Sequence, residues 1–268
     1  MSDTTERPDF DADMAVTPIG PGRYTTAIWR HWWILAGPNG GLILGQLAAA
    51  IIAEINDPAR HLRTLTVHFL RPPIEGPATI DVETIRTGRS VAFLQAVMVQ
   101  EDKIIATAKA AASPAWDVGL AFQDLAMPEV PPPDQCADTS VLDREGPPMR
   151  TNYEYRTVHG YDDSTKPPTS WMRTARPRPL DAVAIAAIVD GMPPPIFVRT
   201  GQPMAVPTIE LTVHFRATLP RTGLAPEDFV LVQASTSTLA EGFVEEDIAI
   251  WGPDGTLLAQ SRQLALAR

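Results

Sequence analysis

The chain of 268 residues has little of several features that would assign it to a simple class of protein. It contains one cysteine, Cys136, so no disulfide can form within it. Acidic residues outnumber basic ones, 32 to 22, and phosphate binding needs a basic surface, so nucleic acid is not an expected partner. No apolar run reaches the roughly 20 residues that cross a bilayer. The polar start, Met1–Phe10, does not resemble a secretory signal. These absences predict a cytoplasmic protein without a membrane span.

Common catalytic arrangements are also missing. The chain has no Gly-x-Ser-x-Gly sequence, which excludes serine hydrolases with a nucleophile elbow. Cys136 lies among prolines with no histidine close in sequence, and a reactive thiol needs a base or an electropositive setting. His68 and His214 lack a second ligand pair, so we expect no metal site. We therefore predict that Cys136 is an inert linker thiol.

The sequence does contain an internal repeat. Leu-Thr-Val-His-Phe occurs at Leu65–Phe69 and again at Leu211–Phe215. A short apolar run precedes each copy, and an opening strand precedes each run. After each copy come three strand-like segments separated by turns, and the Asp254-Gly255 turn is a strong hairpin signal. The predicted strands are Arg23–Trp29, Ala78–Arg86, Val91–Gln100 and Ile104–Ala112 in the first half, and Asn152–Val158, Phe229–Ser237, Phe243–Trp251 and Thr256–Ala267 in the second.

The two apolar runs predict helices that are enclosed by a sheet. Leu42–Ala53 has Gln46 as its one polar residue, and Leu180–Val189 has Asp181. A surface helix would carry a polar face, and about 12 residues are too few for a membrane span. A curved antiparallel sheet around one such helix is the hotdog arrangement. The sequence therefore predicts an α+β fold of two tandem hotdogs that pair side by side.

Proline marks the boundary between the halves. Residues 114–150 include Pro131-Pro132-Pro133 and Pro147-Pro148, a density typical of an extended connector. We predict an N-terminal hotdog over residues 15–113, a connector over residues 114–150 that runs outside both sheets, and a C-terminal hotdog over residues 151–268. The repeat makes His68 and His214 equivalent, and we expect them in core or interface positions.

Both halves also carry short motifs at corresponding places in these elements. The first half carries Pro38-Asn39-Gly40-Gly41 at the start of its helix and His68-Phe69-Leu70-Arg71-Pro72 in the following strand. The second half carries Asp190 after its helix, Thr208 at the start of its long strand and Ala259-Gln260-Ser261-Arg262-Gln263 near the terminus. In the order and spacing of these short motifs, the sequence resembles the acyl-CoA thioesterase II type of double-hotdog enzymes across both halves.

The resemblance implies that Asp190, Thr208 and Gln263 hold an attacking water. An aspartate beyond a helix C-terminus is disfavoured by the helix dipole, and apolar surroundings raise its pKa. Both effects favour a base near neutral pH. The residues alone leave simpler roles open: Asp190 in a turn that ends the helix, Thr208 as an ordinary strand residue, and Gln263 as a satisfied buried amide.

The start of the first helix is the predicted oxyanion site. Backbone N–H groups of Gly40 and Gly41 would face the thioester oxygen, although a tight turn explains the glycine pair equally well. In the family, the helix start of one hotdog faces the catalytic groups of the other, which implies a composite site. Arginines are candidates for the CoA phosphates, with surface solvation as the simpler role, and other CoA contacts stay unassigned. These arginines are Arg86, Arg89, Arg173, Arg176 and Arg178.

We therefore predict a fatty acid metabolism enzyme that hydrolyses acyl-CoA thioesters to free acid and CoA with an activated water. CoA belongs to the substrate, so no separate cofactor and no metal is expected. One alternative is a non-catalytic acyl-CoA-binding hotdog protein. An enoyl-CoA hydratase or dehydratase is a second alternative, but its usual Gly-Asp-x-Asn-Pro context is missing. Acyl chain length and a homo-oligomer of the double-hotdog unit stay open.

Overall fold

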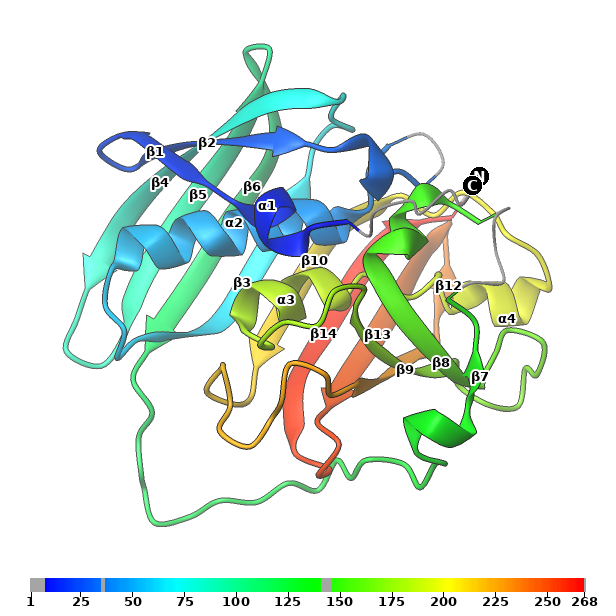
Figure 1. Ribbon diagram of the computed structural model, residues 1–268. Helices are drawn as coiled ribbons and strands as arrows, with labels where there is room; N and C mark the ends of the chain where they lie inside the picture. Colours follow the sequence, from blue (N-terminus) through cyan, green and yellow to red (C-terminus); the bar gives the residue numbers. More distant parts are fainter. Residues whose placement is uncertain (1–7, 35–36, 141–145, 268) are drawn as a thin grey trace, which may run out of the picture.

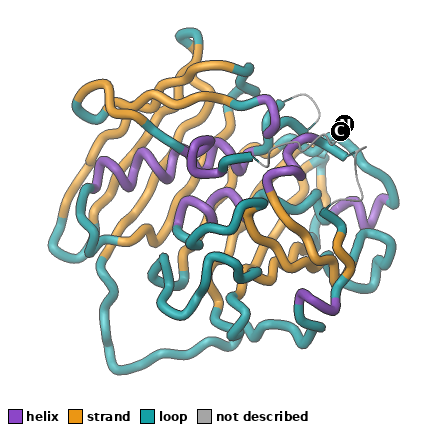
Figure 2. The backbone as a smooth tube through the Cα atoms, viewed as in Figure 1, coloured by secondary structure: helices purple, strands orange, loops and turns teal. Residues whose placement is uncertain are grey.

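The computed structural model describes residues 8–34, 37–140 and 146–267. Its strands form a 14-stranded sheet that continues from one half of the chain into the other (Figure 1). The tube in Figure 2 shows helical segments lying against the strands of both halves. Residues 1–7, on which the expectation about a secretory signal partly rests, lie outside the described residues.

The N-terminal half curves an antiparallel sheet around helix α2 (Gly40–Ile55). Asn39 caps this helix, because its side chain accepts a hydrogen bond from the Gly41 N–H. Leu42, Leu44 and Leu47 are fully buried, as expected for a helix that is apolar on most sides. The sheet order is β1-β2-β4-β5-β6-β3. The strands are β1 (Thr17–Gly20), β2 (Arg23–Ile28), β3 (His61–Phe69), β4 (Gly76–Thr87), β5 (Ala92–Gln100) and β6 (Lys103–Ser113).

The C-terminal half repeats this plan around helix α3 (Ala182–Ile188). Asp181 caps α3 by accepting from the Ala184 N–H, and the helix is buried from Ala184 to its end. The sheet order is β10-β14-β13-β11-β9-β8-β7, with β12 paired to β13. The strands are β7 (Ala137–Asp138), β8 (Tyr153–His159), β9 (Thr169–Thr174), β10 (Thr208–Phe215), β11 (Val230–Ser235), β12 (Leu239–Ala240), β13 (Phe243–Trp251) and β14 (Leu257–Leu266).

Short helices complete the described part of the chain, and none of its helices is long and apolar enough to cross a membrane. They are α1 (Phe10–Met14), α4 (Ile196–Thr200) and the 3₁₀ turns at Arg30–Trp32, Pro133–Gln135 and Pro148–Asn152. Each half therefore encloses one apolar helix in an antiparallel sheet, and the prediction of two tandem hotdogs is confirmed.

Strands β3 and β10 join the two halves. They pair antiparallel with Thr66 opposite Thr212, and the two hydroxyl oxygens lie 2.9 Å apart. These threonines occupy the same position in the repeated sequence. A residue that pairs with its own repeat equivalent lies on a pseudo-two-fold axis, so the axis that relates the hotdogs passes between these strands.

The repeated histidines flank this junction. His68 lies opposite Glu210 and His214 opposite Thr64 in the register of β3 with β10, which places both at the interface of the halves. Both side chains are exposed, so the core alternative is wrong. Strand alternation explains the difference, because Val67 faces the core and its neighbour in sequence must face the opposite side.

Strand β9 was not predicted from the sequence, and it changes how the halves correspond. β9 pairs with β11 as β2 pairs with β4, so β9 is the counterpart of β2. The opening strand predicted at Asn152–Val158 is β8, which lies one position farther out and corresponds to β1. β9 is buried almost throughout and follows Pro167-Pro168, so neither its alternation nor its setting signals a strand.

The proline-rich segment between the halves departs from its prediction at one point. Most of its described length runs along the outside of the molecule (Figure 1), but β7 pairs with β8 at the end of the sheet. The expectation that residues 114–150 stay outside both sheets is therefore wrong at β7. An edge strand presents unpaired N–H and C=O groups, and the connector supplies partners for some of those of β8.

Candidate active site

The two core helices, α2 and α3, lie side by side, and the start of α2 meets the end of α3 (Figure 1). Gly41 marks the closest approach. A Cβ atom at this position would lie 2.4 Å from the Ala187 carbonyl oxygen, a distance that no real Cβ contact allows. A glycine is therefore required at Gly41 for the helices to approach this closely, and their proximity brings the second residue beyond α3 onto the start of α2.

That residue is Asp190. Asn39 Nδ2 donates to Asp190 Oδ2 at 2.7 Å and to its backbone carbonyl oxygen at 2.7 Å. The Gly41 N–H donates to the same Oδ2 at 3.2 Å, and the neighbouring Gly40 N–H also lowers the pKa of this carboxyl group. The structure thus brings three of the predicted site residues together, with Asp190 from one hotdog and both glycines from the other.

Burial dominates the electrostatics of Asp190. It raises the pKa of the carboxyl group to about 7, although the Gly41, Gly40 and Asn39 donors lower it. The predicted dipole effect of α3 is outweighed locally, because the carboxyl group faces the N-terminus of α2, where a helix favours negative charge. Desolvation therefore gives Asp190 the pKa of a base that works near neutral pH.

Thr208 and Gln263 meet on neighbouring strands. Thr208 begins β10, Gln263 lies in β14, and Thr208 Oγ1 donates to Gln263 Oε1 at 3.3 Å. Gln263 is buried, and its Nε2 donates to Glu246. Burial raises the pKa of Glu246 and the charge of Asp190 raises it further, so this glutamate connects the Thr208–Gln263 pair electrostatically with Asp190.

Sequence reasoning did not assign a role to Glu246 or to Tyr153. Glu246 is 3% exposed and lies on the inner face of β13 between Val244 and Ile248. A glutamate in the apolar register of a strand is the signal that would have identified it. The Tyr153 hydroxyl is buried without a hydrogen-bond partner in the described part of the chain, and burial together with Tyr155 and Asp190 raises its pKa. A tyrosine is ordinary in a strand, so the sequence carries no corresponding signal.

The N-terminal hotdog lacks this polar set. The repeat and the strand registers define which residue of the first half stands in each equivalent position. These equivalents are Leu62 for Thr208, Ala110 for Gln263 and Leu94 for Glu246. All three side chains are apolar and buried. The C-terminal hotdog alone therefore carries the polar groups at these positions.

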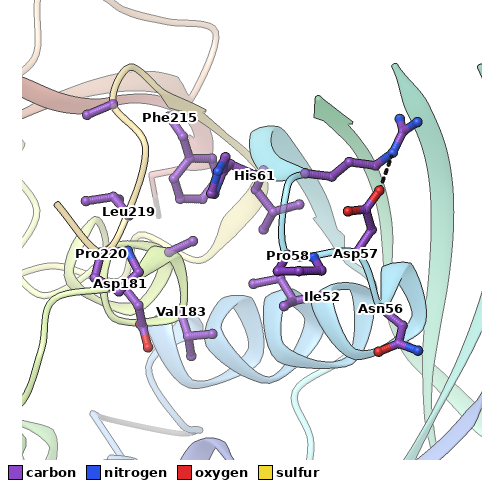
Figure 3. A pocket seen from close by; sticks show the side chains of 14 residues that line it. Ile52, Asn56, Asp57, Pro58, His61, Asp181, Val183, Phe215, Leu219 and Pro220 are labelled. Carbon is purple, nitrogen blue, oxygen red and sulfur yellow. Dashed lines mark hydrogen bonds and ion pairs between the residues drawn. The ribbon is translucent and has the colours of Figure 1, made fainter. Parts of the chain in front are cut away.

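A pocket of about 440 Å³ lies at the opposite end of the helix pair, between the end of α2 and the start of α3 (Figure 3). Ile52, Val183, Phe215 and Leu219 are among its apolar lining residues. Burial lowers the pKa of its His61, and Arg63 lowers it further, so this side chain is uncharged at neutral pH. The pocket is the pseudo-two-fold counterpart of the Asp190 site, and Leu62 lines it at the position equivalent to Thr208.

The described residues also bear on a metal ion and on the phosphates of CoA. Within the described residues there is no cluster of three histidine, cysteine, aspartate or glutamate side chains that would hold a metal ion. Among the CoA candidates, Arg173 pairs with Glu154, Arg178 with Asp181 and Arg176 with Asp9. Arg86 and Arg89 are exposed. The assignment of these arginines to CoA stays a prediction.

Comparison with known proteins identifies the family. Residues 29–113 match the acyl-CoA thioesterase N-terminal domain, and residues 133–267 match the acyl-CoA thioesterase C-terminal domain. The chain has no significant match among curated protein sequences.

Solved structures share the whole architecture. A conserved protein of unknown function with a hot dog fold from Alicyclobacillus acidocaldarius is 25% identical, with a TM-score of 0.87 over 97% of both chains. A putative thioesterase II from Thermobifida fusca is 25% identical, with a TM-score of 0.83 over 96% of this chain and 98% of that one. The acyl-CoA thioesterase II TesB2 from Mycobacterium marinum, at 20% identity, has a TM-score of 0.76 over 97% of this chain and 98% of its own and supports the fold alone. The chain belongs to the acyl-CoA thioesterase family and is a thioester hydrolase with two tandem hotdog domains.

Proposed function

We propose that this chain hydrolyses acyl-CoA thioesters with a water that Asp190 activates and that Thr208 and Gln263 hold. One observation carries the proposal: the carboxyl group of Asp190 lies against the start of α2, with a pKa raised to about 7 by burial. A base with this pKa is half ionised at neutral pH. Half of the molecules then hold the carboxylate that accepts a proton, and the carboxylate is basic enough to take one from water. The carboxyl group of Asp190, from one hotdog, also faces the backbone N–H groups of Gly40 and Gly41, from the other.

The reaction follows from these groups. Asp190 takes a proton from water while the water oxygen forms a bond to the thioester carbonyl carbon, and the carbonyl oxygen becomes an anion. The N–H groups at the start of α2 stabilise negative charge there. When the tetrahedral intermediate collapses, the carbon–sulfur bond breaks and the CoA thiolate receives the proton from Asp190. The products are a free acid and CoA, and Asp190 returns to its ionised form.

Gly40 and Gly41 require a refined role in this scheme. Their N–H groups point at the Asp190 carboxyl group in the structure without substrate. The 3.2 Å contact from Gly41 is longer than a strong charge-assisted hydrogen bond, which is typically about 2.7–2.9 Å. We propose that the thioester oxygen shares these donors once substrate is bound, so the same N–H groups serve the base and the oxyanion.

A panel of acyl-CoAs tests the function. The purified protein is mixed with straight-chain, branched and aromatic acyl-CoAs, and the thiol released is measured with a chromogenic reagent. The expected result is release of CoA from at least one acyl-CoA at a rate proportional to enzyme. A non-catalytic acyl-CoA-binding protein would bind the same compounds and release no thiol, and that outcome would reject the proposal.

Cys136 provides a test of the mechanistic class. Burial raises the pKa of its thiol, Asp134 raises it further, and Sγ lies 3.4 Å from the Pro132 carbonyl oxygen. A thiol with a raised pKa is a poor nucleophile near neutral pH. We expect Cys136→Ala to keep kcat within about two-fold of the parent and mass spectrometry to find no acyl group on Cys136. A large loss of kcat, or a trapped acyl-cysteine, would replace water attack with covalent catalysis.

A further inference from the structure

Glu246 is a buried carboxyl group that the proposed reaction does not use. It lies on the inner face of β13, is 3% exposed, and stands directly opposite Gln263 in the register of β13 with β14. Placing a carboxyl group among apolar side chains costs free energy unless hydrogen bonds compensate for it. Its position in the first half is occupied by Leu94, so the fold itself accepts an apolar residue here.

The contacts of Glu246 fix the orientation of a neighbouring amide. Its Oε2 accepts a hydrogen bond from Gln263 Nε2, while its Oε1 is buried without a partner among the described residues. When Glu246 is ionised, its oxygens only accept; when it is protonated, the unpartnered Oε1 can carry the proton and Oε2 still accepts, so the amide nitrogen of Gln263 faces Oε2. The amide oxygen then faces Thr208, whose hydroxyl donates to it at 3.3 Å.

This orientation determines what Thr208 and Gln263 can offer to water. Because the Thr208 hydroxyl donates its proton to Gln263, the lone pairs of Thr208 Oγ1 stay available to accept. Because Gln263 uses one N–H on Glu246, the second N–H stays available to donate. A water held between Asp190 and this pair would give one proton to Asp190 and find an acceptor and a donor on its other side. If the amide were reversed, its N–H groups would face Thr208 and this order of donors would be lost.

We propose that Glu246 is a positioning residue for the attacking water, acting through the amide of Gln263. This inference rests on the proposed function and extends it to a side chain outside the predicted set. Thr208, Gln263 and Glu246 differ together from the apolar residues at the equivalent positions of the first half. A side chain that only filled space could be apolar here, as in the first half. The glutamate therefore indicates a role shared with Thr208 and Gln263.

The charges around Glu246 predict how the activity depends on pH. Burial raises its pKa to about 8, with Asp190 as the largest charged contributor, Glu245 as a smaller one, and the Gln263 hydrogen bond opposing them. Burial raises the pKa of the Tyr161 hydroxyl, and the charge of Glu246 raises it further. Asp190, with a pKa of about 7, thus ionises before Glu246 as pH rises. Above pH 8 a second negative charge opposes the charge that develops on the thioester oxygen.

Two variants test this role. In Glu246→Gln, the new amide can present oxygen or nitrogen to Gln263, so the orientation of Gln263 is no longer fixed. In Glu246→Leu, the acceptor is removed and replaced by the residue type of the first half, so folding is expected. Both should lower kcat for acyl-CoA by about ten-fold, within the range for a positioned hydrogen-bonding group, and change KM by less than about three-fold. Both should also lose the fall in kcat that the parent shows above pH 8, while the rise near pH 7 from Asp190 remains.

Glu245→Gln is the matched control, because Glu245 is the neighbouring glutamate on β13 and bonds instead to Ser237 and Thr238. It should keep the kcat of the parent and still show the fall in kcat at alkaline pH, moved slightly to lower pH because the Glu245 charge no longer raises the pKa of Glu246. If Glu246→Gln and Glu246→Leu both keep kcat within two-fold and an unchanged pH profile, the positioning role is wrong. The proposed function has a separate check: it fails if the parent releases no CoA or if Asp190→Asn is as active as the parent.

Discussion

Asp190→Asn should lower kcat for acyl-CoA hydrolysis by about 10²–10⁴-fold, the usual contribution of a positioned general base. Asparagine keeps the size of the side chain and can still accept from Asn39 and Gly41 through its oxygen. It cannot take a proton from water, because an amide has no basic lone pair near neutral pH. KM should change little, since the carboxyl group contacts the water rather than CoA. Initial rates of thiol release over a range of acyl-CoA concentrations give both constants.

Asp190→Asn should also change how the stability of the folded protein depends on pH. Burial raises the pKa of Asp190 from 3.8 to about 7, so the folded protein binds this proton more tightly than the unfolded chain. The resulting stabilisation is complete below pH 3.8 and is lost as pH rises through about 7. Asparagine does not titrate. The Tm of the variant relative to the parent should therefore increase between about pH 4 and pH 8. If Asp190 is a turn residue, the variant would instead show near-parental kcat, which would refute the base assignment.

Gly41→Ala should also cause a large loss of kcat, because it displaces the two helices rather than removing the base. The new Cβ would lie 2.4 Å from the Ala187 carbonyl oxygen and 2.6 Å from Asn39 Oδ1, so α2 and α3 must move apart. This displacement separates Asp190 from the start of α2, and a shift of about 1 Å at a catalytic group can cost about 10²-fold in rate. Overpacking of this kind costs about 1–3 kcal/mol of stability. We expect kcat to fall by about two orders of magnitude and Tm to fall with it.

Two glycine variants separate the local clash from a general effect of alanine. Gly20→Ala is the control, since a Cβ there has no atom within 4 Å, and it should leave kcat and Tm unchanged. At Gly40 a Cβ would lie 3.0 Å from Asp190 Oδ2 and 3.1 Å from Phe69 Cζ, so Gly40→Ala should affect kcat more than Tm. Wild-type kcat in a correctly folded Gly41→Ala protein would mean that the contact between the helices does not place the catalytic groups.

The fold was predictable because few arrangements can satisfy a helix that is apolar on most sides. The repeat defined two such helices, and their burial required a sheet around each. The exact strands were harder to predict. β9 is buried on both faces and lacks alternation, and β7 pairs only because β8 leaves an open edge. His68 and His214 were placed at the correct junction, but the strand alternation turns them outward.

Part of the candidate site could also be predicted from the sequence, and part could not. Asp190, Thr208 and Gln263 were reached through the resemblance of short motifs, because their separation in sequence gives no local pattern. The meeting of Asp190 with Gly40 and Gly41 depends on how α2 packs against α3, which no single segment encodes. Glu246 depends on register, since shifting β13 by one residue would turn it to the outer face.

Oxygen labelling in a single turnover tests whether water or an enzyme carboxylate attacks the thioester, where a resulting anhydride is hydrolysed at the carboxyl carbon of the enzyme. The enzyme, in excess over an acyl-CoA that the panel identifies as a substrate, reacts once in water enriched in ¹⁸O. Mass spectrometry then examines the released acid and the peptides that contain Asp190 and Glu246. Direct attack by water predicts one ¹⁸O atom in the acid and none in either side chain. An acid without the label, together with ¹⁸O in the Asp190 or Glu246 carboxyl group, would contradict it, because that pattern requires an anhydride between substrate and enzyme.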